Sequence, residues 1–597
     1  MKTNDILITN LMSDVDNGKI QLPDFQRGWV WDDNHIRALL ASITCNFPVG
    51  AAMFLEYGNP NIIFKYRMIE GAENKNIQPP AELILDGQQR LTSIYSTMYC
   101  KNPVKTKNDK GKEIELFYYI DIEKALDPSC DRIDAIISVP AHTKQITSNF
   151  GKTIVLDLSS PQKEFENKMF PLNIIFDIPA QMQWQTDYRN YYQNHPNFTD
   201  IIAEFTKFYT EIIVEVVKYQ IPVITLDINT PKEAVCQVFE NVNTGGVSLT
   251  VFELLTAVFA MNNFDLREDW EKRRAANFST DILKVITATD FITACTLLKS
   301  YMLGQTVSCK KKDVLNLKFA EYQKCADILT EGFKIAEDFI EDEKIFYSRD
   351  LPYTSQLIPL AVICTLLAEN NLITINANRE KLRQWYWCGV FGELYGGANE
   401  TRYVNDVVDV MNWIVNAGNK PKTVEDCAFI PMRLTTLQTR NSAAYKGFMA
   451  LIMKNQATDF ISGQRMDLVQ FYKGSGIDIH HIFPQKYCTT QNLDKQKWNS
   501  VINKTPLCYS TNREIGGTAP SKYLEKILNS HKNLSRQDLQ NYLATHWIEM
   551  ADCQNDDFDN FIVKRAKSLL DAVENEIGKK ISGRDSDEVK NFFGQSV

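Results

Sequence analysis

The chain has 597 residues, a length that predicts roughly three to four domains. Its net charge of −9 excludes a compact protein that is basic throughout, so any contact with nucleic acid must use local basic patches. The 13 cysteines include no CxxC pair, which predicts free thiols in a reducing cytoplasm and argues against a disulfide framework or a zinc ribbon. The N-terminus shows no signal-peptide pattern, and the longest apolar run, residues 357–368, is too short to span a bilayer, so we expect no membrane contact.

The first part of the chain alternates short strand-like runs with helical patterns. Residues 82–86 (ELILD) and 221–228 (IPVITLDI) predict buried strands. Between them, residues 100–115 are rich in lysine and asparagine and predict an exposed hairpin, which leads into a strand at 116–122. This alternation is typical of a mixed α/β domain.

From about residue 233 to 418, apolar residues recur at helical spacing, which predicts a mostly helical region. The apolar run at 357–368 predicts a buried helix within it. Trp385, Tyr386 and Trp387 are interpreted as core residues, and a pocket that recognises a nucleic-acid base is the alternative.

These patterns predict an α+β multidomain chain. We expect a first domain at 1–235, a helical middle domain at 236–419 and a third domain at 420–575. The last residues, 576–597, predict a flexible tail. The helical middle is interpreted either as a scaffold that couples sites in its two neighbours or as a sensor, and both interpretations stay open.

The segment LPDFQRGWVWD, residues 22–32, contains Gln26 and Arg27 followed by two alternating tryptophans. Trp29 and Trp31 are interpreted as core residues, because large aromatic side chains dominate protein cores. Stacking on a nucleic-acid base is the alternative.

A second segment, LILDGQQRLTSIYS at residues 83–96, predicts a strand that turns directly into a helix. Asp86 and Gln89 fit a capping box at the helix start, and Gly87 permits a tight turn. The N–H groups of that helix start, with Arg90 one turn in, suit a phosphate. The alternative is a capped helix whose arginine pairs with a nearby acid.

Together the two segments resemble the GmrSD-type N-terminal domain, which is similar to the ParB/sulfiredoxin fold. A third segment, residues 238–255, looks like the Asn-x-x-Gly segment of that family, although Thr250 and Glu253 in it also fit an ordinary capping box. The resemblance covers roughly residues 1–260 and implies that this domain binds and hydrolyses a nucleoside triphosphate, or that it contacts nucleic acid. The implied nucleotide-binding residues are Gln26, Arg27, Asp86, Gly87, Gln88, Gln89 and Arg90.

An adjacent histidine pair stands out near the C-terminus, because the chain has only 7 histidines. His480 and His481 lie in GSGIDIHHIFPQKYC, residues 474–488, and Asn503 and Asn512 follow. This pattern resembles the HNH nuclease motif, in which a β-hairpin and a helix hold one divalent metal ion. The resemblance implies a C-terminal ββα-metal (HNH) nuclease domain that accompanies the ParB/sulfiredoxin-like domain.

The resemblance also implies a role for each residue of the motif. His481 falls at the position of the general base, and Asn503 at the position that braces the loop carrying it. His480 and Asn512 fall at the positions of the metal ligands, for Mg²⁺ or Mn²⁺. Strand alternation puts Asp478 on the side of His480, so it is either a further ligand or a support for one.

The surroundings of the motif add a basic face. Cys488 and Cys508 are too few for a zinc knuckle and predict buried thiols. Local positive charge can hold a DNA backbone despite the acidic total. The predicted DNA-binding residues are Lys486, Lys504, Arg513 and Lys522.

The two resemblances together imply a cytoplasmic, nucleotide-regulated, metal-dependent DNA endonuclease of bacterial anti-phage defence, directed by DNA modification. One alternative is an NTP-hydrolysing switch protein that binds DNA through a non-cleaving HNH-like domain. Another is an RNA-directed nuclease, because substrate choice depends on groove shape and loop contacts. Whether the chain forms a homo-oligomer stays open.

Overall fold

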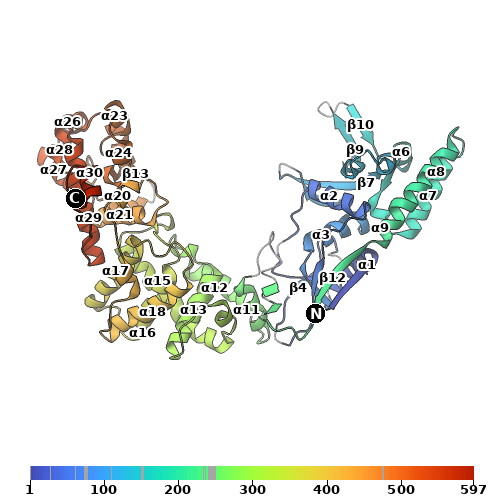
Figure 1. The fold of residues 1–597 in the computed structure, drawn as a ribbon, viewed down its shortest axis with the longest axis horizontal. Coiled ribbons are helices and arrows are strands. Elements are labelled where there is room, and N and C mark those ends of the chain that lie inside the picture. The colour runs from blue at the N-terminus through green and yellow to red at the C-terminus, as the bar shows by residue number, and fades with distance from the viewer. Residues whose placement is uncertain are drawn as a thin grey trace. The chain divides into compact units, whose positions relative to one another are not determined.

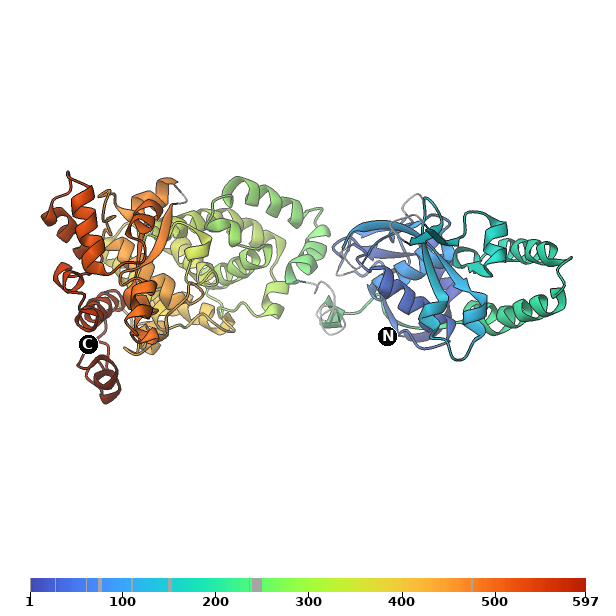
Figure 2. The same cartoon turned by 90° about the horizontal axis from the view of Figure 1, so that it is seen from above.

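A computed structural model of the chain divides into two compact units, residues 1–266 and 267–597, and each is described by itself (Figures 1 and 2). Within the described residues, no helix is long and apolar enough to cross a membrane. The structure describes the chain except residues 1, 27, 61, 73–77, 109–110, 149–152, 233, 236, 239–249, 474–475 and the side chains of 471–473.

In the described part of unit 1, six strands form a mixed sheet in the order β1-β12-β3-β5-β2-β4. β5 (Glu82–Asp86) and β12 (Gln220–Leu226) confirm the two predicted buried strands. β12 runs parallel to β3 (Ala52–Glu56), and β2 (Ile20–Pro23) runs parallel to β5. The remaining neighbours in this sheet pair antiparallel.

The predicted lysine-rich hairpin is also confirmed. β6 (Val104–Lys107) pairs antiparallel with β7 (Glu113–Asp121), and β7 continues between two further strands as part of a second sheet. Beside these sheets, α7 (Ile178–Tyr192) and α8 (Phe198–Phe208) lie against each other through aromatic side chains (Figure 1). The other strands and helices of this unit are β1 (Lys2–Leu7), α1 (Ile8–Asp16), α2 (Asp33–Thr44), β4 (Tyr66–Arg67), α3 (Gln88–Ile94), α4 (Ile122–Leu126), α5 (Arg132–Ala135), β8 (Ile136–Pro140), β9 (Gln145–Ser148), β10 (Thr153–Asp157), α6 (Pro161–Glu166), β11 (Met169–Pro171), α9 (Val214–Lys218) and α11 (Val251–Ala260).

Helices bury one apolar face each against the larger sheet. Leu11 of α1 and Ile36 and Leu40 of α2 lie in the same buried cluster as Phe54 and Ile84 of the strands. Burial of such side chains stabilises each by about 1.5–3 kcal/mol. The cluster therefore fixes the sheet edge from which the Asp86-Gly87 turn begins.

Unit 2 is mostly helical up to its C-terminal part. α16 (Leu357–Glu369) is buried along nearly its whole length, which confirms the buried helix predicted there. Trp385 and Trp387 of α17 (Asn376–Phe391) are fully buried, which confirms their interpretation as core residues. The Trp387 indole donates to the buried Glu343 carboxylate, which Arg383 and Lys454 also contact. The other helices before residue 474 are α12 (Leu266–Asn277), α13 (Ala288–Met302), α14 (Lys311–Leu315), α15 (Phe319–Asp342), α18 (Glu400–Val415), α19 (Lys422–Asp426), α20 (Arg433–Thr436), α21 (Ala443–Lys454) and α22 (Met466–Lys473).

The histidine pair lies in a two-stranded sheet followed by a helix. β13 (Ile477–His481) pairs antiparallel with β14 (Lys504–Cys508), and α25 (Tyr509–Ile515) begins directly after β14. The long connection between the strands carries α23 (Gln485–Thr490) and α24 (Lys495–Trp498). Four helices come next: α26 (Pro520–Ser530), α27 (Arg536–Ala544), α28 (Met550–Gln554) and α29 (Phe558–Ile577).

The predicted domain boundaries stay predictions, and the compact units place one helix differently. α11, expected in the helical middle, belongs to the unit that ends at residue 266. The predicted flexible tail, 576–597, contains α30 (Asp587–Phe593). In this segment Val597 is buried and its carbonyl accepts from Arg584 at 2.7 Å.

Candidate functional site

The hairpin brings the three predicted metal ligands together. Side chains alternate along a strand, so Asp478 and His480 share one face of β13. On that face, His480 Nδ1 lies 2.8 Å from Asn512 Oδ1 of α25. The Asn512 amide nitrogen donates to Asp478 at 3.2 Å. One residue of the helix therefore contacts two residues of the strand.

His480 is buried beside aromatic rings. Its ring centroid lies 6.4 Å from that of Phe460 and 6.0 Å from that of Tyr523. Burial lowers the pKa of His480 to about 4, because the charged imidazolium loses its hydration. The imidazole is therefore neutral at physiological pH, which is the form that binds a metal.

The donor set fits a divalent ion with open positions. Two ligands at about 2.1 Å from one ion and at right angles lie roughly 3 Å apart, close to the separation of His480 Nδ1 and Asn512 Oδ1. Across the described part of the chain, no cluster of three His, Cys, Asp or Glu side chains is placed to hold an ion. An ion here would have one imidazole, one amide oxygen and the Asp478 carboxylate as protein ligands. Water or phosphate would fill the other positions, as in catalytic sites.

His481 points to the other face of the strand and is half-buried. Its Nε2 lies 3.4 Å from Asn499 Oδ1. Burial, and then the charge of Lys504, lower the pKa of His481 below its usual value. A neutral imidazole at physiological pH can accept a proton from water, which is the task of a general base.

Asn503 braces the loop that follows His481. Its side chain is fully buried, and its amide oxygen accepts from the Phe483 backbone N–H at 2.8 Å. Its amide nitrogen donates to the carbonyls of Phe483 and Trp498 at 2.9 and 2.8 Å. These hydrogen bonds join the Phe483 backbone to the segment that precedes β14, and the motif role of Asn503 stays a prediction.

Sequence reasoning missed two residues that hold this site from behind. Asp459 accepts from the Cys508 backbone N–H at 2.9 Å and from the Thr511 hydroxyl at 2.7 Å, so it fixes the start of α25. His546 is fully buried and contacts the Thr505 hydroxyl at 2.6 Å through Nδ1. Neither residue belongs to a recognisable motif, and their contacts join segments about 40 to 50 residues apart.

Three of the four residues predicted to form the basic face are exposed, and one is buried. Lys486, Arg513 and Lys522 are exposed. Lys504 is buried instead, its ammonium donates to the Gln438 carbonyl at 2.6 Å, and burial lowers its pKa to about 8. The prediction that it adds to an exposed DNA-binding face is wrong, because its place in β14 directs its side chain inward.

The two flanking cysteines differ from each other. Cys488 is buried as predicted, whereas Cys508 is only half-buried. Neither forms a disulfide within the described part of the chain, and nor do the other described cysteines.

In unit 1, the turn between β5 and α3 differs from the predicted capping box. Gly87, at φ +94°, is the N-cap of α3, and no side chain caps the helix. Asp86 instead ends β5 and contacts the Arg90 guanidinium at 3.0 Å. The capping-box prediction is wrong because the turn is closed by a left-handed glycine, so the carboxylate is directed to the arginine.

Arg90 is tied to the backbone next to this turn. Its two terminal nitrogens donate to the carbonyls of Val49 and Ala51 at 2.7 and 2.9 Å. Gly50 lies between them at φ +87°, and a Cβ there would lie 2.7 Å from Arg90 Nη1. The arginine therefore clamps the β3 start onto the β5 turn, in addition to pairing with Asp86.

Two glutamines of the predicted nucleotide site carry unused polar atoms. Gln26 donates to the Ile84 carbonyl at 2.7 Å, and Gln89 accepts from the Val30 N–H at 3.0 Å. Gln26 Oε1 and Gln89 Nε2 are buried without a hydrogen-bond partner among the described residues. Gln88 is the first residue of α3.

Two tryptophans flank these glutamines, and part of the motif set lies outside the description. Trp29 and Trp31 are partly buried and pack against the edge of the core rather than inside it. The predicted site residue Arg27 and the Asn-x-x-Gly positions within 239–249 lie outside the described residues. Downstream, Glu253 accepts from the Thr250 N–H at 3.1 Å, which agrees with the expected cap of α11.

Residues 8–260 match the family model of the GmrSD restriction endonuclease N-terminal domain. This match supports a GmrSD-type assignment of the first unit and suggests a restriction or defence nuclease. A relative from Methanocaldococcus jannaschii, named "Uncharacterized protein MJ0686", is 28% identical over 612 residues. That similarity covers 95% of this chain and 98% of the relative, so it extends through both the GmrSD-type unit and the hairpin.

Replacing Asn503 with alanine should loosen the loop behind His481. The change leaves the Phe483 N–H and the Trp498 carbonyl unpaired, while the Phe483 carbonyl keeps the Cys488 thiol, and it should lower the free energy of unfolding of unit 2 by about 2–3 kcal/mol. Hydrogen exchange of a peptide over residues 482–490 should rise, because the Phe483 amide loses its acceptor. Asn499→Ala is the matched control and should leave this exchange unchanged. Equal exchange in both variants would contradict the bracing role.

Proposed function

We propose that the chain is a metal-dependent DNA endonuclease of the GmrSD restriction type, in which the hairpin of unit 2 hydrolyses phosphodiester bonds. The observation that carries the proposal is the arrangement of four motif residues: His480 against Asn512 on one face, His481 on the other and Asn503 behind the loop. The family match of residues 8–260 supports the restriction role independently of that geometry. Anti-phage defence directed by DNA modification belongs to the same proposal.

In the reaction, His481 accepts a proton from the attacking water. Asn499 and the hydrogen bonds of Asn503 hold the base and its loop in position. His480, Asn512 and Asp478 would hold the divalent ion. When bound, that ion supplies Lewis-acid stabilisation of the scissile phosphate and of the leaving oxygen.

DNA contact in this proposal uses the exposed cations around the hairpin. Lys486 lies in the first turn of α23, Arg513 on α25 and Lys522 on α26, and all three are exposed. Each contact between a cation and a phosphate releases counterions, so binding should weaken steeply as salt rises. Local positive charge of this kind allows contact with a phosphate backbone although the net charge of the chain is −9.

Replacing His481 with alanine should reduce DNA cleavage by about 10²- to 10⁴-fold, because the reaction loses its general base. DNA affinity and thermal stability should stay near those of the wild type. His531→Ala is the matched control, since that histidine contacts Glu514 and lies outside the hairpin. Gel assays with modified and unmodified phage DNA, and with RNA, measure the change. Unchanged DNA cleavage by the His481 variant would refute the assignment, and cleavage of RNA alone would support the RNA-directed alternative.

Replacing His480 with alanine should weaken Mn²⁺ binding at least about tenfold, because the ion loses its imidazole ligand. Titration calorimetry of the full chain measures this without a cleavage assay. In the wild type, Mn²⁺, Co²⁺ or Ni²⁺ should support cleavage at least as well as Mg²⁺, since imidazole and amide ligands are softer than carboxylates. Full cleavage in excess EDTA would exclude the metal.

We further propose that unit 1 binds a nucleoside triphosphate and controls cleavage. The unused polar atoms of Gln26 and Gln89 beside the Asp86-Gly87 turn support a polar ligand there. Because Arg90 already binds two carbonyls, a phosphate would share this guanidinium rather than find it free. Trp29, half-buried beside the same turn, donates from its indole to Ser93 of α3.

Gln89→Ala should abolish a rise in melting temperature caused by nucleotide, while leaving the melting temperature without nucleotide within a few degrees of wild type. Arg90→Ala should instead lower the melting temperature without any ligand, because it breaks the clamp. Gln183→Ala, on the exposed face of α7, is the control. Thermal melting with each nucleotide measures the three variants. If no nucleotide raises the melting temperature of the wild type and the wild type hydrolyses none of them, the regulatory proposal fails.

A further inference from the structure

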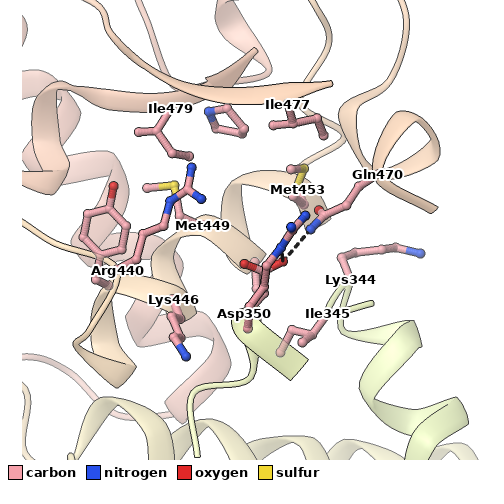
Figure 3. Close-up of a pocket in the computed structure, with 14 residues that line it drawn as sticks. Lys344, Ile345, Asp350, Arg440, Lys446, Met449, Met453, Gln470, Ile477 and Ile479 are labelled. Carbon is pink, nitrogen blue, oxygen red and sulfur yellow. Dashed lines mark hydrogen bonds and ion pairs between the residues drawn. The ribbon is translucent and has the colours of Figure 1, made fainter. Parts of the chain in front are cut away.

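A pocket lies on the face of β13 that is turned away from His480 (Figure 3). Ile477 and Ile479 line it, and they alternate along the strand with the proposed ligands Asp478 and His480. The cavity has a volume of about 70 Å³, which holds on the order of five water molecules.

The two sides of the pocket are apolar. Figure 3 shows the strand residues on one side and side chains of α21 facing them. Such walls favour a flat, weakly hydrated ring over a flexible polar chain, because its faces lose little hydration when they are buried. The apolar lining consists of Ile345, Met449, Met453, Ile477, Ile479 and Pro506.

A carboxylate and an amide face the same space. Gln470 donates from its amide nitrogen to Asp350 Oδ2 at 2.8 Å (Figure 3). The Arg349 guanidinium also lies 3.7 Å from Asp350 Oδ2, so among the described residues Asp350 Oδ1 and Gln470 Oε1 are the two acceptor atoms here with no hydrogen-bond donor. Burial raises the pKa of the Asp350 carboxyl, so a ligand that donates hydrogen bonds would replace lost hydration. Exocyclic amino groups of nucleobases are donors of this kind.

Cations also line the pocket. Arg440 is exposed and has no hydrogen-bond partner among the described residues, so its guanidinium can bind a phosphate in a bidentate manner. Lys446 is different, because its ammonium already donates to the Leu351 carbonyl at 2.8 Å. Arg349 and Lys344 complete the basic lining.

The pocket adjoins the side of the hairpin that carries the proposed base. Ile479 and His481 lie two residues apart on one face of β13, which separates them by roughly 7 Å. Tyr445 lines the pocket, and the Lys504 ammonium lies 5.9 Å from its ring centroid. Lys504 is the residue paired with His481 across the hairpin. A ligand in the pocket is thus close to the position of the attacking water.

We propose that this pocket binds a single nucleotide, with an amino-bearing base between the apolar walls and its phosphate at Arg440. Asp350 and Gln470 read the amino edge of the base. The nucleotide has two sources of the same chemistry: a residue extruded from DNA beside the cut, or a free mononucleotide. The first source rests on the proposed nuclease function, and the second does not. Extrusion costs a few kcal/mol of lost stacking and pairing, which a closely fitting pocket offsets.

The test for the base uses calorimetry of the full chain with dCMP, dGMP, dAMP and dTMP, of which dTMP lacks an amino group. The wild type should prefer the amino-bearing nucleotides, and Asp350→Asn should weaken dCMP at least about tenfold while changing dTMP little. Arg440→Ala should weaken all four alike, because it removes the phosphate partner. Lys334→Ala, in an exposed ion pair with Glu331, is the control. Melting temperatures confirm that each variant folds.

A second arm distinguishes the two sources. Duplex DNA with one 2-aminopurine is mixed with the full chain in EDTA, and fluorescence reports an unstacked base. A rise that Asp350→Asn removes assigns the pocket to extruded DNA, whereas mononucleotide binding without a rise assigns it to the free ligand. Pocket variants that bind and cleave like the wild type would overturn the proposal and leave the nuclease function intact. Mononucleotide binding in a protein that cleaves nothing would support the pocket while the proposed function fails.

Discussion

Arg565 carries its guanidinium from α29 into the interior of unit 2, where its described partners are backbone carbonyls. It donates to the carbonyls of Val501 and Ile502, and to that of His546 at 3.1 Å. Burial lowers the pKa of this arginine to about 9, because the charge has lost its hydration. An interaction that costs this much is retained where it fixes geometry. Here it fixes the two residues that immediately precede Asn503.

Two further buried side chains then hold the hairpin in position through direct contacts. Asn503, once placed, holds the Phe483 backbone and thereby the loop after His481. The opposite strand is held by His546 through Thr505. Buried networks of this kind favour one strand register over its neighbours, because a shifted strand would leave their members unpaired. A slip of one residue would exchange the faces of the two adjacent histidines.

Local patterns predicted the elements, but not the partners that position them. The apolar runs at 82–86 and 357–368 and the hairpin at 100–115 are local signals, and each formed the expected element. The burial of Lys504 and the role of Arg565 depend on contacts between segments about 65 residues apart. The pattern of residues in one segment does not indicate which distant carbonyl a lysine or arginine side chain will donate to.

The same argument applies to the two motifs. The resemblance to the HNH motif placed His480 and Asn512 on a hairpin and the helix after it, and the structure has the two side chains 2.8 Å apart. At the other motif, Asp86 and Gln89 fitted a capping box by spacing, yet the turn is capped by Gly87. A left-handed glycine and an acceptor side chain both start helices, and which one does so depends on what Arg90 contacts nearby.

The hydrogen bonds from Asn503 to Phe483 and Trp498 also close a loop of the chain. The connection from Pro484 to Lys497 begins and ends at one anchored point, although it carries two short helices. Closing a longer loop costs little, about 0.6 kcal/mol for each doubling of its length. This connection can therefore lengthen, shorten or change its surface between related proteins while the strands stay in register. Its surface can change there without disturbing the hairpin to which we assign the proposed cleavage.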